Sequence, residues 1–358
     1  AVSNGTAALH VACLAAGIGE GDEVITTPIT FAASANCVLY CGGTPVFADI
    51  DPDTYNISPE ELEKKITSRT KAIIPVHYTG QPCDMDAILE IAHKHNLLVV
   101  EDGAHALGAA YKGKKIGTIA DMTCFSFHPV KPVTTGEGGM IVTDNEELYR
   151  RLVLYRSHGI TRDKDMMQQY EEQLQQSSDP ALQEAADMLR GDVIDPGGWY
   201  YQQLELGYNY RITDISCALG ASQMDKLDRF LERRRQIAKK YDETFADIPQ
   251  IKTPWQQEGC QSGWHLYMIQ TMERSRREVF DGLRQAGIGV NVHYIPVYRH
   301  PYYQRNGYAG VHCLNAEAFY ERAISLPIFP GLTGQQQDYV IEHVIKECTA
   351  KTGRKNEG

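Results

Sequence analysis

The sequence predicts an α/β fold, with a large domain built on a mostly parallel sheet and a smaller α/β domain at the C-terminal end. Strand-length apolar segments alternate with helical segments at short spacing over residues 22–101, as in sheets that carry helices on both faces. A chain of 358 residues is also too long for one ordinary hydrophobic core. We therefore expect the large domain to comprise residues 1–225 and the small domain residues 226–358.

Composition and charge narrow the range of functions. The chain is 42% hydrophobic and 23% charged, which is ordinary for a soluble protein, and its net charge of −11 argues against nucleic-acid binding. No apolar run approaches about 18 residues, so no membrane span is expected, and no signal peptide is recognisable. The nine cysteines form no Cys-x-x-Cys pair, and Cys13, Cys124 and Cys217 lie in apolar runs. Buried thiols in a reducing cytoplasm explain this pattern better than a metal site does. We therefore predict no metal site.

The elements of the first half follow from local signals. Ser, Asn, Gly and Thr precede an Ala/Leu-rich run at the first helix, and Ser58 is followed by Glu60 and Glu61 at the third. Both patterns are typical of helix starts. We predict helices over residues 3–16, 31–40, 59–66 and 85–95, and strands over 22–26, 44–50, 72–76 and 97–101.

The second half is predicted in the same way. Strands are expected at 122–127 and 139–143. Residues 161–206 form an insertion with a polar helical part at 167–190, for which a disordered linker is the alternative. A long helix is expected over 212–246, with apolar positions 215, 219, 224, 227, 231 and 237 on its buried face. The C-terminal tail should alternate strands at 264–270 and 290–295 with helices at 277–286 and 335–348.

Lys131 is the most informative residue. It follows an apolar, β-branched and aromatic run that reads as a strand buried on both faces and that ends before Pro129. A lysine with a desolvated stem and a depressed pKa can act as a nucleophile toward carbonyls, including that of pyridoxal phosphate (PLP). A single lysine in a loop is more often simply solvated, so the interpretation depends on the other motifs.

Three motifs accompany Lys131. The helix start at residues 4–7 combines backbone N–H groups, a hydroxyl and the positive end of the helix dipole, which suits a phosphate. Asp102 ends an apolar strand, where α/β sheets place their ligand sites, and could pair with a pyridinium N–H or merely cap the next turn. Phe31 follows another strand and could stack on a flat cofactor or pack in the core.

The order of these motifs resembles that of a known family. Six segments carry the resemblance: Ser-Asn-Gly-Thr-Ala-Ala-Leu at 3–9, Pro-Ile-Thr-Phe at 28–31, Glu-Asp-Gly-Ala-His at 101–105, Ser-Phe-His-Pro-Val-Lys at 126–131, Gly-Glu-Gly-Gly at 136–139 and Gly-Tyr-Asn-Tyr-Arg-Ile-Thr-Asp at 207–214. Together they are similar to the DegT/DnrJ/EryC1/StrS family of PLP-dependent nucleotide-sugar aminotransferases. The resemblance runs to about residue 345 and implies an aspartate-aminotransferase-like (type I) fold, a homodimer and shared active sites.

The resemblance also implies roles for individual residues at the cofactor ring. Lys131 would carry PLP covalently and then move the proton between substrate and cofactor. Asp102 would pair with the pyridine nitrogen, and Phe31 would stack on one ring face. His105 would lie near the ring hydroxyl.

The remaining roles concern the phosphate and the substrate. The phosphate would be bound by Gly5, Thr6 and Ser126, and Asn209 would reach the phosphate of the neighbouring subunit's cofactor. His293 and Tyr294 would belong to the nucleotide-sugar pocket.

The segments at 131–132, 156–160 and 292–298 resemble most closely the branch that acts in pseudaminic acid synthesis. That branch implies transfer of an amino group from L-glutamate to C4 of a UDP-linked 4-keto-6-deoxy-N-acetylhexosamine, through pyridoxamine phosphate. Amination of another nucleotide-linked keto sugar, at C3 or C4, and a non-catalytic regulatory role on the same fold stay open. The family also carries a segment ahead of the motif that starts at residue 3, so we expect that segment to be missing from this sequence. The insertion at 161–206 is expected either to act as a lid over the active site or to have no function of its own.

Two other enzyme classes are disfavoured by particular residues. A sugar dehydratase of this fold would have histidine in place of Lys131. A nicotinamide-dependent oxidoreductase would need a glycine-rich turn between a strand and a helix, whereas the glycines at 17–21 follow a helix and precede a strand.

Overall fold

The computed structural model describes residues 1–194 and 197–350, and the chain forms two compact units. The first unit comprises residues 1–144 together with the chain from 212 onward, and the second comprises residues 145–211. The division of the chain between residues 225 and 226 stays a prediction.

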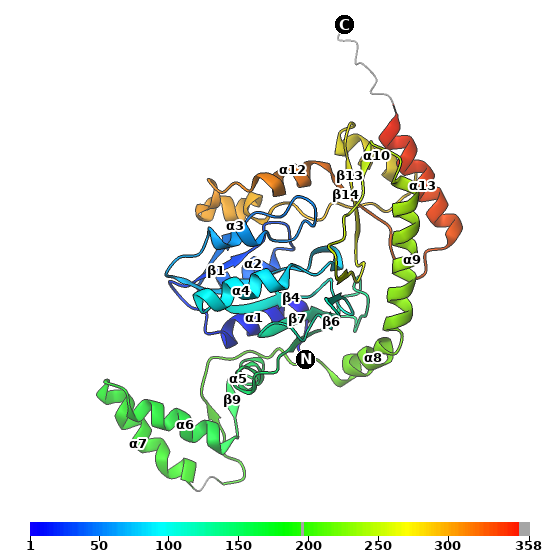
Figure 1. Ribbon diagram of the computed structural model, residues 1–358. Helices are drawn as coiled ribbons and strands as arrows, with labels where there is room; N and C mark the ends of the chain where they lie inside the picture. Colours follow the sequence, from blue (N-terminus) through cyan, green and yellow to red (C-terminus); the bar gives the residue numbers. More distant parts are fainter. Residues whose placement is uncertain (195–196, 351–358) are drawn as a thin grey trace. The chain divides into compact units, whose positions relative to one another are not determined.

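A six-stranded sheet organises the first unit (Figure 1). The strands lie in the order β2-β1-β3-β4-β7-β8, and all neighbours pair in parallel except β8, which is antiparallel to β7. Their bounds are Glu23–Thr26 (β1), Thr44–Phe47 (β2), Thr70–Ile74 (β3), Leu98–Asp102 (β4), Met122–Ser126 (β7) and Gly139–Val142 (β8). The mostly parallel sheet predicted from the sequence is therefore confirmed, and the central strands are buried on both faces as such sheets require.

Helices cover both faces of this sheet. Residues of α4 and the start of α9 share one core cluster with Ile25, Ile73 and Val99, whereas α1 contacts β7 and β8 and packs against α2. Side chains of Asn4, Ser58 and Asp84 accept hydrogen bonds from the first turns of α1, α3 and α4. The start signals predicted the first two of these caps. These helices span Gly5–Ala15 (α1), Ala33–Tyr40 (α2), Pro59–Glu63 (α3), Met85–His95 (α4) and Leu227–Phe245 (α9).

A second hydrophobic core in the same unit lies nearer the C-terminus. A three-stranded antiparallel sheet in the order β11-β13-β14 packs with α9, α10 and α13 around it. The elements are Ile251–Lys252 (β11), Tyr267–Thr271 (β13), Arg276–Gln285 (α10), Leu314–Arg322 (α12), Ala323–Leu326 (β14) and Gly334–Thr349 (α13). A small antiparallel sheet, β12-β5-β6, joins Cys260–Gln261, Ala110–Tyr111 and Lys114–Lys115.

Short helical turns complete this unit. They span Tyr78–Gly80 (η1), Val297–Arg299 (η2), Pro301–Tyr303 (α11) and Gln304–Tyr308 (η3).

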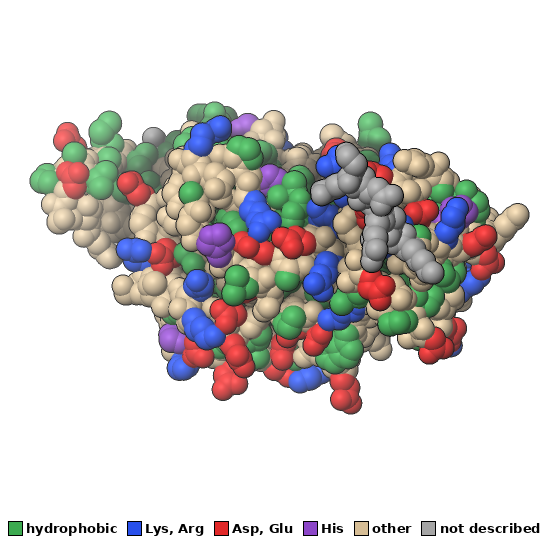
Figure 2. All heavy atoms as spheres, turned by 90° about the horizontal axis from the view of Figure 1, so that it is seen from above, with side chains coloured by type: hydrophobic (Ala, Val, Ile, Leu, Met, Phe, Trp, Pro, Cys, Tyr) green, Lys and Arg blue, Asp and Glu red, His purple; other side chains and the backbone are tan. Residues whose placement is uncertain are grey.

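Acidic, basic and apolar side chains are interspersed on the face shown in Figure 2, in keeping with the net charge of −11.

The second unit contains the predicted helical insertion. Its polar part forms two helices, α6 (Lys164–Gln175) and α7 (Pro180–Ile194), that pack against each other, so the helical prediction is confirmed with a break between them. The unit also contains α5 (Glu146–Arg156) and the antiparallel pair β9 (Ile160–Thr161) and β10 (Gln202–Gln203). A lid function for the insertion stays a prediction.

The prediction of one helix over 212–246 is wrong. The chain forms α8 (Asp214–Met224) and then α9, separated by a turn at residues 225–226. The apolar positions Ile215, Leu219 and Met224 are 85%, 42% and 45% exposed, and Cys217, predicted to be buried, is exposed as well. The apolar spacing correctly predicted helical structure in this segment. In the described part of the chain, however, no residue of α8 is buried.

A strand at 290–295 is also not observed. Only Asn291 pairs there, in an isolated bridge with Ser325. The segment ends at Pro296, which has no N–H to donate to a ladder. Among the described residues, no helix has both the length and the apolar character of a membrane span.

Candidate active site

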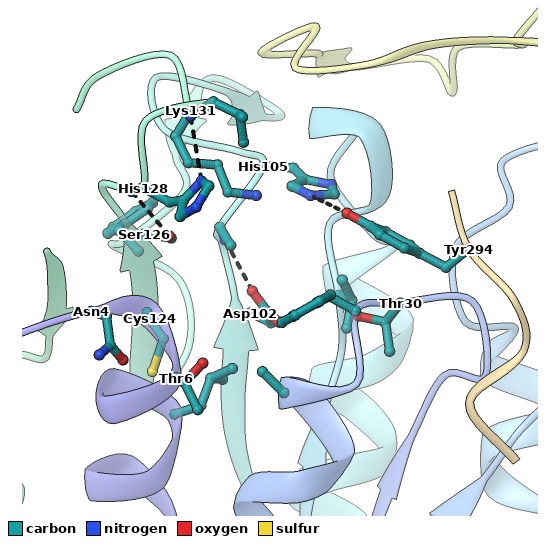
Figure 3. Close-up of a pocket in the computed structure, with 18 of the residues that line it drawn as sticks. Asn4, Thr6, Thr30, Asp102, His105, Cys124, Ser126, His128, Lys131 and Tyr294 are labelled. Carbon is teal, nitrogen blue, oxygen red and sulfur yellow. Dashed lines mark hydrogen bonds between the residues drawn. The ribbon is translucent and has the colours of Figure 1, made fainter. Parts of the chain in front are cut away.

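A cavity of about 340 Å³ lies at the carboxyl edge of the six-stranded sheet. It brings together residues that are far apart in the sequence, from the start of α1, the ends of β4 and β7, and the loop after β7 (Figure 3). The predicted site residues that line it are Gly5, Thr6, Phe31, Asp102, His105, Ser126, Lys131, His293 and Tyr294. Parallel strands direct their carboxyl ends to one edge, which explains why motifs at successive strand ends meet there.

One end of the cavity is the N-terminus of α1. The side chain of Asn4 accepts a hydrogen bond from Ala7 N at 2.8 Å, while the first N–H groups of a helix have no intrahelical acceptor. Gly5 lies so close to β7 that a Cβ atom there would be 2.8 Å from the Cβ of Ser126. Only glycine therefore allows this approach, which places the N–H groups, the Thr6 side chain and the Ser126 hydroxyl around one anion-sized space.

The start of α1 is also fixed to the sheet. Val2 and Gly139 exchange backbone hydrogen bonds of 2.8 and 2.9 Å, which tie the chain before α1 to β8. A Cβ atom on Gly139 would be 2.5 Å from the backbone oxygen of Asn4, so this contact also requires glycine. The Gly-Glu-Gly-Gly motif thus has a structural role in holding the helix start.

Asp102 lies at the end of β4 and is buried. One carboxylate oxygen accepts a hydrogen bond from Ser34 Oγ at 2.6 Å, and the other accepts one from Ala104 N at 3.0 Å. These two donors fix the orientation of the carboxylate. Ser34 was missed in the sequence, where it reads as an ordinary residue of the helix after Phe31.

Lys131 lies between these two ends, on the loop after β7. Its backbone N–H donates to His128 O at 2.9 Å, and its Nζ is 3.5 Å from His265 Nε2. Burial lowers the pKa of Lys131 from 10.5 to about 8, and the negative charge of Asp102 opposes this effect. A substantial fraction of the amine is therefore neutral near physiological pH.

Histidines surround the lysine. Burial lowers the pKa values of His105 and His265 well below the usual range, and the charge of Lys131 lowers them further. Burial and Lys131 likewise lower the pKa of His293 to about 4, and its Nδ1 is 2.9 Å from Ser325 Oγ. These imidazoles are neutral, so they can form hydrogen bonds without repelling the lysine.

Tyr294 closes another side of the cavity. Its hydroxyl is 3.3 Å from His105 Nε2, and burial raises its pKa, so the phenol stays protonated. Phe31 lies beside it at a ring-centroid distance of 6.3 Å and is 62% exposed. An apolar ring left this exposed at a cavity offers a surface for a flat ligand.

Asn209 lies in the second unit, where its backbone pairs with Ser157. Its predicted contact with a neighbouring subunit's cofactor stays a prediction. His265 is a second residue that sequence reasoning missed, because Trp264 and His265 read as the start of a core strand.

The donor set fits PLP. The helix N-terminus and hydroxyls suit a phosphate, the buried Asp102 carboxylate suits a pyridinium N–H, and the Lys131 amine with its lowered pKa suits an aldehyde. The described residues contain no group of three or more His, Cys, Asp or Glu side chains arranged to hold a metal ion.

Comparison with known proteins supports the same conclusion. The sequence profile of the DegT/DnrJ/EryC1/StrS aminotransferase family matches residues 1–345. The spore coat polysaccharide biosynthesis protein SpsC of Bacillus subtilis is 43% identical over 350 residues, which cover 96% of this chain and 84% of SpsC.

Two solved structures are similar throughout. PseC of Helicobacter pylori, an aminotransferase of pseudaminic acid biosynthesis, is 32% identical with a TM-score of 0.82, over 97% of this chain and 85% of PseC. Spr1654 of Streptococcus pneumoniae, described as a sugar aminotransferase and solved in PLP and PMP forms, is 32% identical with TM-scores of 0.83 and 0.84, over 97% of this chain and 86% of Spr1654. The chain is a PLP-dependent sugar aminotransferase and belongs to the DegT/DnrJ/EryC1/StrS aminotransferase family.

Proposed function

We propose that this aminotransferase moves an amino group from L-glutamate to C4 of a UDP-linked 4-keto-6-deoxy-N-acetylhexosamine, giving UDP-4-amino-4,6-dideoxy-N-acetyl-β-L-altrosamine. The observation that carries the transaminase chemistry is the placement of Lys131, Asp102 and the N-terminus of α1 around one cavity. The choice of sugar is supported by the similarity to PseC and by the motifs at 156–160 and 292–298.

The residues would hold the cofactor by a covalent bond, by its phosphate, by its pyridine nitrogen and ring hydroxyl, and by one face of its ring. Lys131 would hold it covalently through Nζ, and Gly5, Thr6 and Ser126 would bind its phosphate. Asp102 would pair with its pyridine nitrogen, Phe31 would cover one ring face, and His105 would lie near its ring hydroxyl. When bound, PLP supplies an electron sink for the charge that develops on the substrate carbon.

Lys131 would also move the proton. At pH 7, a pKa of about 8 leaves about a tenth of the amine neutral, against well under a thousandth for an unperturbed lysine. The neutral amine is a base, and after accepting a proton it is an acid, so one residue can take the proton from one carbon and deliver it to another. Ser34 Oγ and Ala104 N donate to Asp102 and hold its carboxylate in place beside the site.

His293 and Tyr294 would contact the nucleotide sugar. Ser325 Oγ orients His293, and the Tyr294 hydroxyl bonds to His105, so both side chains are held at the cavity wall. A UDP-linked substrate and L-glutamate would use the same cavity in turn.

We propose a homodimer with shared active sites and a cytoplasmic location. The exposed apolar side chains of α8, Ile215, Leu219 and Met224, would be covered by a second copy of the chain. Asn209 would then contribute to the partner's phosphate site. The cytoplasmic location is inferred from cysteine usage, because a reducing compartment best suits nine unpaired thiols.

A second candidate is amination of a different nucleotide-linked keto sugar, at C3 or C4. The observation in its favour is the identity to SpsC, 43%, which exceeds the 32% identity to PseC.

The test is a substrate panel. The protein with PLP and L-glutamate is incubated with UDP-4-keto-6-deoxy-N-acetylhexosamines and with dTDP-linked 3-keto and 4-keto sugars, and products are identified by mass spectrometry and NMR. We expect the C4-aminated UDP sugar with the wild type and none with K131A. Turnover of dTDP-linked sugars alone would replace the proposed substrate.

A further inference from the structure

His265 lies directly behind the Lys131 amine. Its Nε2 is 3.5 Å from the Nζ of Lys131, and its ring centroid is 4.4 Å from that of His105. The side chain is only 6% exposed, and its Nδ1 has no hydrogen-bond partner among the described residues. It does not belong to the lining of the cavity, so any influence on the reaction passes through the lining residues that it contacts, Lys131 and His105.

The backbone around His265 is fixed on both sides. Gly263 N donates to Gly80 O at 3.0 Å, and Leu266 N donates to Thr79 O at 3.2 Å. These bonds dock the segment against the η1 turn. Gly80 itself has a φ of +105°, and a Cβ atom there would be 2.8 Å from the backbone oxygen of His105. The close docking therefore depends on glycine.

A buried arginine holds the same segment from α9. The Nη1 of Arg234 donates to the backbone oxygens of Trp264 and His265 at 2.9 and 3.2 Å, and to that of Ile328 at 2.9 Å. Trp264 has a φ of 47°, a left-handed conformation that is unfavourable for a bulky residue. This conformation places the Trp264 ring in the C-terminal core and leaves His265 beside the lysine. The structure thus sets the position of one imidazole with several independent contacts.

The electrostatic setting makes His265 an acceptor. Burial lowers its pKa, and the positive charges of Lys131 and Arg234 and the neighbouring rings of His105 and His293 lower it further. A neutral imidazole accepts a hydrogen bond from an amine and adds no positive charge beside it. Lys131 also faces the Asp102 charge on its other side.

We propose that His265 is a positioning residue that holds the Nζ of Lys131 by accepting its hydrogen bond whenever the amine is not bonded to the cofactor. A lysine side chain has four flexible torsions, and ordering it costs conformational entropy. An acceptor at a fixed place keeps the released amine within reach of the reacting carbon. This inference rests on the proposed role of Lys131 as the residue that carries PLP.

The first test measures Lys131 in the cofactor-free full-length protein. The rate of Lys131 acetylation by acetic anhydride is followed by mass spectrometry across pH in wild type, H265F and H265Q. Phenylalanine keeps the ring but lacks the acceptor, whereas glutamine places an amide near the position of Nε2. We expect a pKa about one pH unit lower for Lys131 in H265F, since the ammonium loses a partner, and a titration near that of wild type in H265Q.

Y267F is the matched control. Tyr267 lies two residues further along the chain, at the start of β13, and Y267F removes a hydroxyl that donates to Asp242 at 2.6 Å; Tyr267 does not line the cavity. Its Lys131 titration should match wild type. H265L, which also lacks an acceptor, serves if H265F does not fold. The proposal would be overturned if the Lys131 pKa in H265F equalled that of wild type. It would also be overturned if the Lys131 pKa fell as far in H265Q as in H265F.

The second test follows the reaction of the PLP-loaded protein with L-glutamate. We expect H265F to slow the loss of the visible band roughly tenfold or more and to enlarge the kinetic effect of deuterium at the glutamate α-carbon, because the proton transfer by Lys131 is delayed. Wild type and K131A distinguish an error in the role of Lys131 from an error in the role of His265. If wild type shows no visible band, or K131A keeps it, the role of Lys131 is wrong; if both behave as proposed and H265F reacts like wild type, only the role of His265 is wrong.

Discussion

At the scale of single residues, the account depends on a lysine whose charge is unfavourable where it lies. In the cofactor-free protein, the pKa of Lys131 is about 8 in the folded state against 10.5 in an unfolded chain. Between these two values the unfolded chain binds more protons, so Lys131 makes the folded state gain stability as pH rises from about 8 to 10.5. Below about pH 8 the buried ammonium destabilises the fold by a constant amount.

This leads to a prediction for K131M, which keeps the stem and removes the charge. Without cofactor, the variant should be more stable than wild type at pH 7 by roughly 1–3 kcal/mol, allowing for partial solvation of the amine. The difference should shrink toward pH 10.5. Urea unfolding at several pH values measures it, and a difference independent of pH would show that the lysine is not desolvated.

Gly5 provides a second prediction. In G5A the new Cβ would lie 2.8 Å from the Cβ of Ser126, so α1 must move away from β7. The phosphate site is then distorted, and we expect the affinity for PLP to fall at least about tenfold. Fluorescence titration with PLP measures this. G19A is the control, since a Cβ at Gly19 meets nothing within 4 Å and should leave the affinity unchanged; equal affinities in both variants would contradict the phosphate assignment.

The sequence predicted the residues that lie at strand ends and missed those that act through tertiary contact. Asp102 and Lys131 stand directly after apolar runs, so their position at the carboxyl edge followed from the strand pattern. Ser34 and His265 gave no local sign of their roles. Ser34 is bonded to a carboxylate 68 positions away, and His265 meets Lys131 across 134 positions.

At the scale of elements, helix-start signals and burial patterns located helices and strands reliably. Apolar periodicity alone was not sufficient to locate the end of a helix or to show what its apolar face packs against. The helix at 85–95 was predicted with its observed bounds, and in the structure Asp84 caps its start and Asn96 ends it in a left-handed conformation. The segment at 212–246 has a helical period throughout, but that period does not reveal the turn at 225–226. It also cannot tell whether an apolar stripe faces the core of its own chain or another molecule.

The exposed stripe of α8 gives a third prediction. Ile215 is 85% exposed, so I215D should change the stability of a single chain by no more than about 0.5 kcal/mol. If a second copy covers α8, the charge should weaken dimerisation at least about a hundredfold. Sedimentation velocity over a concentration series measures this.

The control for I215D places the same charge elsewhere. Leu314 is 75% exposed on α12, and L314D should leave the association unchanged. Equal sedimentation of I215D and wild type would mean that α8 is not part of the interface.

At the scale of the whole molecule, the fold places its site where a mostly parallel sheet ends, and the predicted α/β class was sufficient to locate it. The division into units was less accessible. The second unit comprises residues 145–211, wider than the insertion predicted at 161–206, because α5 packs with β9 and residues 155–158 pair with residues 208–210. Such long-range backbone pairing leaves no pattern in the local sequence.

Sharing of active sites between subunits is a prediction at this scale. K131A and N209D should each be inactive alone, the second because an added carboxylate repels the cofactor phosphate. After the two are mixed under conditions of subunit exchange, about a quarter of the wild-type activity should return, since half of the dimers are mixed and each has one intact site. Product formation measured before and after exchange tests this. No recovery in exchanged dimers would place Asn209 in its own subunit's site, and an active N209D would place it outside both sites.

The central claim is that Lys131 carries PLP and performs the transamination. The most direct measurement is the absorbance spectrum of the full chain with PLP, before and after addition of L-glutamate, in wild type and K131A. We predict a visible band in wild type that disappears with glutamate as pyridoxamine phosphate forms, and no such band in K131A. A K131A protein with the same band and the same response to glutamate would contradict the account.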